Sequence, residues 1–242
     1  MKVVAIIQAR MGSTRLPGKV LKKVRNKSLL EYQLERVKKA TLLHDIVIAT
    51  TINKRDEEIV NFCKARSIPY YRGSEEDVLT RYYEAARMCN ADVIVRLTSD
   101  CPLVDPSIID RNVAEFLSDP SLDYVSNTIE RTYPRGMDIE VFSISTLERL
   151  RREATSPSER EHVTSFLTRN PNMFQIKQVK QSNDDSQYRL TVDTQEDFFV
   201  IKNVIENLYM NSPMFSTEEV VNYLKKMPDI VKINQDIKQK EL

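Results

Sequence analysis

Glycine is scarce in this chain. The 242 residues contain four, Gly12, Gly18, Gly73 and Gly136, where average usage of about 7% would give about 17. A chain that uses so little glycine tends to keep it where the backbone needs a positive φ or a close approach to another group. All four lie in segments that we expect to be loops, either as ordinary turns or at a binding site.

Cysteine is also sparse, and no long apolar run is present. Cys63, Cys89 and Cys101 lie far apart without a CxxC pair, which argues against a disulfide framework and against a zinc site. The apolar run Val3 to Ile7 is too short for the core of a signal peptide. No run approaches the roughly 18 apolar residues that cross a membrane. We therefore expect a cytoplasmic protein without a membrane partner.

A strong net charge is absent as well. The 36 basic and 35 acidic side chains leave a net charge of +1, so the composition gives no general case for a nucleic-acid partner. Hydrophobic residues make up 41%, and this length is ample to bury a core. We expect one domain spanning residues 1–242.

Short β-branched runs alternate with helical patterns in the first half of the chain. Central strands are predicted at 3–7, 46–51 and 92–98, and helices at 28–40, at 55–66 and from Ser74. This alternation indicates an α/β fold with a mainly parallel sheet. Further strands are expected at 69–72, 123–127, 139–143, 173–180 and 188–192, and further helices from Ser145, over 158–169, from Thr194 and from Ser216. The stretch of about 128–172 breaks the rhythm and is predicted to be an inserted arm.

The loop after the first strand, QARMGSTRLPGK at residues 8–19, holds three cations and two glycines. Ligands of open parallel sheets bind at the carboxyl ends of the strands, and such a loop suits a polyanion. Five residues separate Gly12 from Gly18, and Val20 follows Lys19, which excludes a P-loop. There is no GxGxxG either. We interpret the loop as a phosphate site rather than a solvated basic turn.

Two aspartates stand at the ends of predicted strands. Asp100 follows the strand VIVRLT, and Asp193 follows RLTV directly before the expected helix cap Thr194. From the pattern alone Asp193 is as consistent with a cap as with a functional carboxylate. Cys101 suggests a nucleophile, but no local feature marks one of the two histidines as its base, so we interpret Cys101 as structural.

Several motifs together resemble a known family. The loop QARMGSTRLPGK, SDCP at Asp100 and LTVDTQED at Asp193 are similar to motifs of the cytidylyltransferases that activate ulosonic and sialic acids. The loop and REHVT at 160–164 point most closely to the spore-coat polysaccharide protein SpsF group, and RGMDIEVF at 135–142 is similar to a segment of the family near the acceptor sugar. The resemblance covers nearly the whole chain. It implies a three-layer α/β/α fold of the nucleotide-diphospho-sugar transferase type, with a mixed, mainly parallel sheet.

The resemblance also implies roles for individual residues. It implies that Asp100 and Asp193 bind Mg²⁺, and that Arg10, Arg15 and Lys19 act on the triphosphate of CTP. The implied nucleotide-binding residues are Arg10, Met11, Gly12, Ser13, Arg15, Lys19, Arg72, Ser74 and Thr98. Those implied for the acceptor are Arg135, Asp138, Glu140 and His162. Asp138 and Glu140 share one face of a predicted strand, which is equally consistent with a plain polar face. A cap explains Ser74, and His162 alone would more often be structural.

The expected reaction is transfer of CMP from CTP to a hydroxyl of an acidic sugar, with release of pyrophosphate, for a surface polysaccharide. Thr98 and Ser99 replace the Gln-Gly of the octulosonate enzymes, which leaves the sugar open. The family implies a homodimer built by the 128–172 arm. Two alternatives are a metal-dependent glycosyltransferase, although the chain has no DxD motif, and a non-catalytic nucleotide-binding protein of a polysaccharide pathway.

Overall fold

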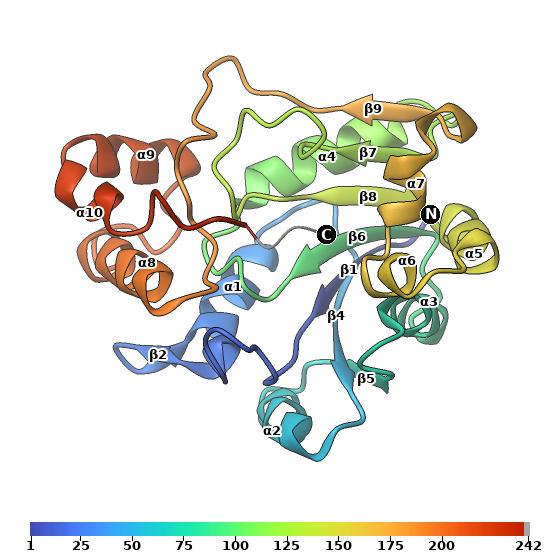
Figure 1. The fold of residues 1–242 in the computed structure, drawn as a ribbon, viewed down its shortest axis with the longest axis horizontal. Coiled ribbons are helices and arrows are strands. Elements are labelled where there is room, and N and C mark those ends of the chain that lie inside the picture. The colour runs from blue at the N-terminus through green and yellow to red at the C-terminus, as the bar shows by residue number, and fades with distance from the viewer. Residues whose placement is uncertain (240–242) are drawn as a thin grey trace.

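The computed structural model describes residues 1–239, and its centre is a seven-stranded sheet (Figure 1). In sheet order the strands are β5 (Tyr70–Gly73), β4 (Asp45–Thr51), β1 (Val3–Gln8), β6 (Val93–Thr98), β8 (Glu140–Ser143), β7 (Tyr124–Ser126) and β9 (Ile176–Gln178). Neighbouring strands from β5 to β6 pair in parallel, as do β7 and β9. Only β8 is antiparallel to its neighbours in this sheet. The predicted mixed, mainly parallel sheet is confirmed.

Strand β1 is buried on both faces, and its side chains alternate between two cores. Val3, Ala5 and Ile7 belong to one core, and Val4 and Ile6 belong to the other. Helices that contribute to the first core are α1 (Leu29–Val37), α2 (Glu57–Ala65), α4 (Pro106–Leu117), α8 (Gln195–Leu208) and α9 (Thr217–Lys225). Helices of the second core are α3 (Val78–Met88), α5 (Ile144–Glu153) and α7 (Ser165–Arg169). This is the predicted α/β/α arrangement.

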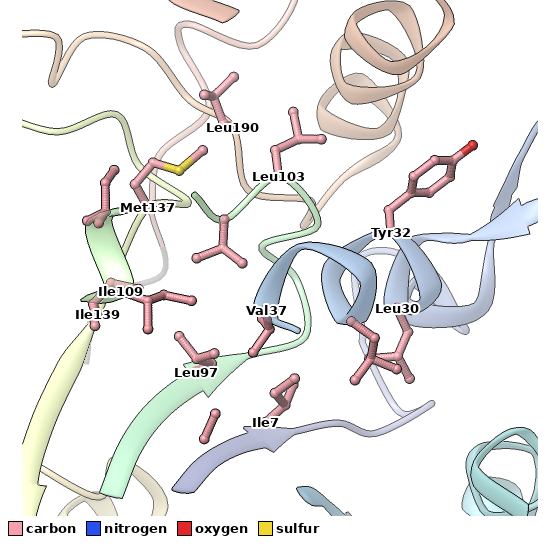
Figure 2. Packing of buried hydrophobic residues seen from close by; sticks show 14 of the residues in the cluster. Ile7, Leu30, Tyr32, Val37, Leu97, Leu103, Ile109, Met137, Ile139 and Leu190 are labelled. Carbon is pink, nitrogen blue, oxygen red and sulfur yellow. The ribbon is translucent and has the colours of Figure 1, made fainter. Parts of the chain in front are cut away.

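The first core shows how a helix closes onto the sheet. Ile7 of β1 and Leu97 of β6 lie beneath Leu30 and Val37 of α1 (Figure 2). All four side chains are at most 2% exposed, so each gains close to the full hydrophobic free energy of burial, about 1.5–3 kcal/mol.

The smaller elements are β2 (Lys23–Val24), β3 (Lys27–Ser28), α6 (Pro157–Glu161), α10 (Pro228–Lys232) and the 3₁₀ helices η1 (Lys19–Leu21), η2 (Lys54–Asp56) and η3 (Pro171–Met173).

Some predicted boundaries are wrong. Helix α3 begins at Val78, because Asp77 rather than Ser74 caps it, and Ser143 rather than Ser145 caps α5. The helix predicted over 158–169 is split into α6 and α7.

The predicted strand 188–192 makes a single bridge, in which Arg189 pairs with Arg135. The backbone of that segment hydrogen-bonds to two different loops, at Arg135 and at Asp100. Because no single strand runs alongside it, no regular ladder forms. The caps at Thr194 and Ser216 are confirmed as capping boxes.

The segment 128–172 contributes β8 to the main sheet, and it forms α5, α6 and α7 after that strand. Its role as an arm for a dimer or for substrate stays a prediction.

Two of the rare glycines meet the expected backbone requirement. Gly18 has φ +69, and Gly136 has φ +104, where a Cβ would lie 2.6 Å from the backbone carbon of Leu190. No helix within residues 1–239 has the length and apolarity needed to span a bilayer.

Asp105 connects two helices on the first core. Its carboxylate accepts the backbone N–H and the hydroxyl of Ser107 at the start of α4 and also those of Thr217 at the start of α9, at 2.7–3.0 Å. Burial alone raises the pKa of Asp105, but these hydrogen bonds outweigh it and leave the pKa below its ordinary value. The charged form therefore stabilises the fold.

We predict that Asp105→Ala lowers the free energy of unfolding at pH 7 by about 2–4 kcal/mol, because a helix cap is lost and buried donors of Thr217 lose their acceptor. The depressed pKa means that this stability is present above about pH 4 and is lost as the pH falls further. Urea unfolding from pH 7 to pH 3 measures the difference.

The chain contains a matched control in a second Asp-Pro-Ser sequence. Asp119 accepts the same two bonds from Ser121, and within residues 1–239 no hydrogen bond or salt bridge joins its carboxylate to a second helix. Asp119→Ala should therefore cost much less than Asp105→Ala. Equal losses in the two variants would contradict a role for Asp105 in joining α4 to α9.

Candidate active site

The loop that follows β1 is folded back on itself by backbone hydrogen bonds. The N–H groups of Ser13 and Gly18 both donate to the carbonyl of Met11, at 3.0 and 2.9 Å. The N–H of Met11 donates to the buried carboxylate of Asp56 at 2.7 Å. The loop is thus held at the carboxyl end of the parallel strands, where the sequence analysis expects a ligand.

A cavity opens beside this loop, and we name it the loop cavity. Predicted site residues that line it are Arg10, Ser13, Arg15, Lys19, Thr98, Asp100, His162 and Asp193. These eight residues come from four separate parts of the chain and meet around one space. Arg10 also pairs with Glu75 at 3.2 Å across the surface.

Lys19 is the contact that joins the two predicted metal ligands. Its Nζ lies 3.2 Å from Oδ2 of Asp100 and 2.8 Å from Oδ1 of Asp193. The two aspartates are 93 residues apart in sequence, yet both point at this one ammonium. The structure therefore brings the two carboxylates together, as the sequence analysis expects, and it places a cation between them.

Asp193 is held by two further cations. Its Oδ2 lies 3.1 Å from Arg15 and 2.8 Å from Arg189. Arg189 is buried, and its Nε donates to Asp197 at 2.8 Å. Asp197 in turn accepts the backbone N–H of Asp193 at 2.9 Å. This network fixes the orientation of the Asp193 carboxylate.

Asp100 is ionised in this setting. The loss of surrounding water alone raises its pKa, but the charge of Lys19 and a hydrogen bond from Thr98 bring the pKa below its ordinary value. Cys101 shows the opposite behaviour, since burial and the neighbouring charge of Asp100 raise the pKa of its thiol well above the usual range. A protonated, buried thiol is a poor nucleophile, which agrees with the structural interpretation of Cys101.

A second cavity lies beside β8, and we name it the β8 cavity. It is lined by Arg135, Asp138 and Glu140, and it shares Thr98, Asp100 and His162 with the loop cavity. All four residues predicted for the acceptor side therefore line one space that adjoins Asp100. Asp100 stands between the two cavities.

The charged groups of the β8 cavity differ in their partners. Asp138 is tied to Arg131 by two hydrogen bonds of 2.6 and 2.9 Å. Within residues 1–239 no salt bridge or side-chain hydrogen bond engages the guanidinium of Arg135. Burial and the neighbouring charge of Arg131 lower the pKa of Arg135. Arg135 is thus a partly desolvated cation that faces the cavity.

Glu140 is already fully engaged by the protein. It forms a buried ion pair with Arg96 and accepts hydroxyl hydrogen bonds from Tyr124 at 2.7 Å and from Thr164 at 2.5 Å. Thr164 lies at the break between α6 and α7, so Glu140 anchors the segment that carries His162. A role of Glu140 in binding a substrate directly stays a prediction.

Four predicted nucleotide-binding residues lie outside the lining of the loop cavity. Met11 packs against the first core, and a Cβ on Gly12 would meet the guanidinium of Arg55 at 2.4 Å. Arg72 donates to the carbonyl of Thr51 and pairs with Glu57 at 2.7 Å. Ser74 accepts the N–H groups of Glu76 and Asp77. Their contact with a nucleotide stays a prediction.

Several residues of the site were not predicted from the sequence. Arg189 and Asp197 hold Asp193, Arg131 holds Asp138, and Gln239 lines both cavities. Arg189 was detectable in principle, because an arginine inside an apolar segment needs a buried partner. No local pattern in the sequence indicated Gln239, because its position beside the two cavities depends on the tertiary fold.

The fold and the two cavities, which share lining residues, define an α/β protein of the nucleotidyl-transfer class, with paired carboxylates beside a basic loop. The chain matches the cytidylyltransferase family model over residues 4–237 and belongs to the cytidylyltransferase family. It is 33% identical to the spore coat polysaccharide biosynthesis protein SpsF of Bacillus subtilis, over 94% of this chain and 95% of that one. It is 38% identical to an uncharacterized protein of Methanocaldococcus jannaschii, over 99% and 97% of the two chains.

Solved structures agree with the sequence comparison. A cytidylyltransferase from Leptospira borgpetersenii superposes with a TM-score of 0.92 at 39% identity, covering 100% of both chains. A CMP:2-keto-3-deoxy-manno-octonic acid synthetase complexed with CTP has a TM-score of 0.67 at 18% identity, covering 85% of this chain and 99% of that one. The synthetase therefore has the same fold as this chain.

We predict that Arg189→Met lowers the free energy of unfolding by about 3–5 kcal/mol, because it leaves the carboxylate of Asp197 buried without its cation. Asp197 has no exposed surface. Arg152→Met is the matched control, since Arg152 pairs with Glu153 on the surface and such pairs contribute little. Thermal and urea unfolding of both variants measure the effect. Equal stabilities would contradict the role of Arg189 as the cation that neutralises the buried carboxylate of Asp197.

Proposed function

We propose that this cytidylyltransferase transfers CMP from CTP to a hydroxyl of an acidic sugar and releases pyrophosphate. The observation that supports this most is the position of Asp100, which lines both cavities. A carboxylate at that junction stands between a polyphosphate in the loop cavity and an acceptor in the β8 cavity. The relationship to SpsF supports a place in surface polysaccharide synthesis.

The loop cavity suits the triphosphate. Arg10, Arg15 and Lys19 supply positive charge, and Ser13 adds a hydroxyl. Cations held by a rigid loop stabilise the negative charge that develops as a phosphoryl group is transferred. Lys19 and Arg15 also stabilise the pyrophosphate that leaves.

The paired aspartates fit a divalent metal. Both carboxylates already converge on one cation, Nζ of Lys19, and Mg²⁺ favours one or two carboxylates completed by phosphate oxygens and water. Within residues 1–239 no group of three His, Cys, Asp or Glu side chains could hold a metal alone. When bound there, Mg²⁺ would neutralise phosphate charge and orient the α-phosphate. A protein of this fold from Mycobacterium tuberculosis, 15% identical with a TM-score of 0.59, is solved as a complex with manganese.

The β8 cavity suits an acidic sugar. The guanidinium of Arg135 is a fitting partner for a carboxylate. Hydroxyl groups of Thr128, Thr164, Thr168 and Thr191 also line the cavity and can exchange hydrogen bonds with sugar hydroxyls. The acceptor would then be held by its charge at one end, with a hydroxyl directed toward Asp100.

The test is a screen of CTP, ATP, GTP and UTP against acidic and neutral sugars in Mg²⁺, read by pyrophosphate release. We expect release with CTP and an acidic sugar. Asp100→Asn should lower kcat about 10³-fold, because metal coordination and charge stabilisation are lost together. Cys101→Ala is the control beside it and should keep most activity.

The outcomes separate the alternatives. In a parallel incubation with nucleotide sugars, release of a nucleoside mono- or diphosphate would indicate a glycosyltransferase. Tight CTP binding without turnover on any sugar would indicate a non-catalytic protein. Full activity of Asp100→Asn with unchanged circular dichroism would show that the metal site is assigned wrongly.

A further inference from the structure

The charges around Asp193 are balanced within the protein. Asp100, Asp193 and Asp197 contribute three carboxylates, and Lys19, Arg15 and Arg189 contribute three cations that contact them. A divalent cation that approached these aspartates would therefore meet a neutral cluster rather than two free negative charges. It would also have to displace the ammonium of Lys19, which lies between the two carboxylates.

The three cations differ in how firmly they are held. Arg189 is buried, and a second carboxylate, Asp197, holds it from behind. Lys19 and Arg15 both line the loop cavity, where the side chain of Arg15 is 36% exposed and that of Lys19 is 12% exposed. An incoming polyphosphate can thus attract Lys19 and Arg15 but leaves Arg189 in place.

We propose that Lys19 acts as an internal counter-cation that occupies the metal position until a polyphosphate draws it away, so that metal and nucleotide bind as a unit. The proposal rests on the proposed function, because it takes Asp100 and Asp193 as the metal ligands. It adds an order of events to that function. Metal binds weakly to the free protein, and the phosphate chain both releases the carboxylates and supplies the missing ligand oxygens.

Such an exchange couples the binding of the metal to the binding of the phosphate chain, and the coupling is reciprocal. If the phosphate chain raises the affinity for metal, then metal raises the affinity for the phosphate chain by the same factor. The arrangement also keeps two neighbouring carboxylates from repelling each other in the free protein. Arg189 remains with Asp193 in both states and preserves the orientation of that carboxylate.

The experiment measures binding of Mn²⁺ alone by electron paramagnetic resonance, with no nucleotide present. Lys19→Met removes the charge and keeps the length of the side chain, so it should bind Mn²⁺ about tenfold more tightly than the wild type. Lys23→Met is the matched control, because Lys23 is exposed on β2 and contacts neither aspartate, and it should bind Mn²⁺ as the wild type does. Adding Asp100→Asn to Lys19→Met should abolish the gain, which shows that the metal binds at the aspartates.

Arg15→Gln is the second variant, because the side chain of Arg15 is partly exposed and its replacement should leave the fold intact. It should strengthen Mn²⁺ binding less than Lys19→Met, because Arg15 contacts one aspartate only. Unchanged Mn²⁺ affinity in a folded Lys19→Met variant would overturn the counter-cation role and leave the proposed function standing. Tighter binding that survives Asp100→Asn would instead show that the metal binds elsewhere.

Discussion

The contact of Lys19 with Asp100 and Asp193 is the constraint that the rest of the site depends on. The three residues come from the loop after β1, the end of β6 and the segment before α8, and each is carried by a buried part of the fold. Two carboxylates this close would repel each other without a cation between them. The hydrophobic core positions the backbone, and the ion pairs with Lys19 then hold the two aspartate side chains together at the centre of the site.

The surrounding structure positions the residues of this contact from two sides. On one side, Arg189 and Asp197 form a buried support that fixes Asp193 and is itself tied to the start of α8. On the other side, Gly136 lets the chain turn close against Leu190, which brings Arg135 beside the segment that leads to Asp193. Strand β8 contributes Glu140 to the lining of the β8 cavity. Support of this kind is what a site needs for precise placement of reacting groups.

Much of the fold and the centre of the site could be predicted from the sequence. Asp100 was recognisable because it follows the buried strand β6 at the carboxyl edge of the parallel strands. For Asp193 the pattern left a cap and a functional carboxylate equally open, since the segment before it forms no ladder in the sheet, and the resemblance alone implied its role. The pairing with Lys19 was not predictable, because it depends on how the loop folds back through Met11 and Gly18. Glu140 shows the same limit. Its two-residue spacing from Asp138 indicated a shared face, but its buried partner Arg96 lies on a strand 44 residues earlier. The break between α6 and α7 also follows from a tertiary contact, that of Thr164 with Glu140.

Asp100 and Asp193 form a cation position that Lys19 fills in the free protein and that, as we propose, a metal takes over when the nucleotide binds. The most direct measurement is anomalous diffraction from a crystal of the protein with CTP and Mn²⁺. We expect a manganese peak between the two carboxylates, with Nζ of Lys19 moved away onto the phosphates. A manganese peak elsewhere, or Lys19 still bridging the aspartates with CTP and Mn²⁺ bound, would contradict it.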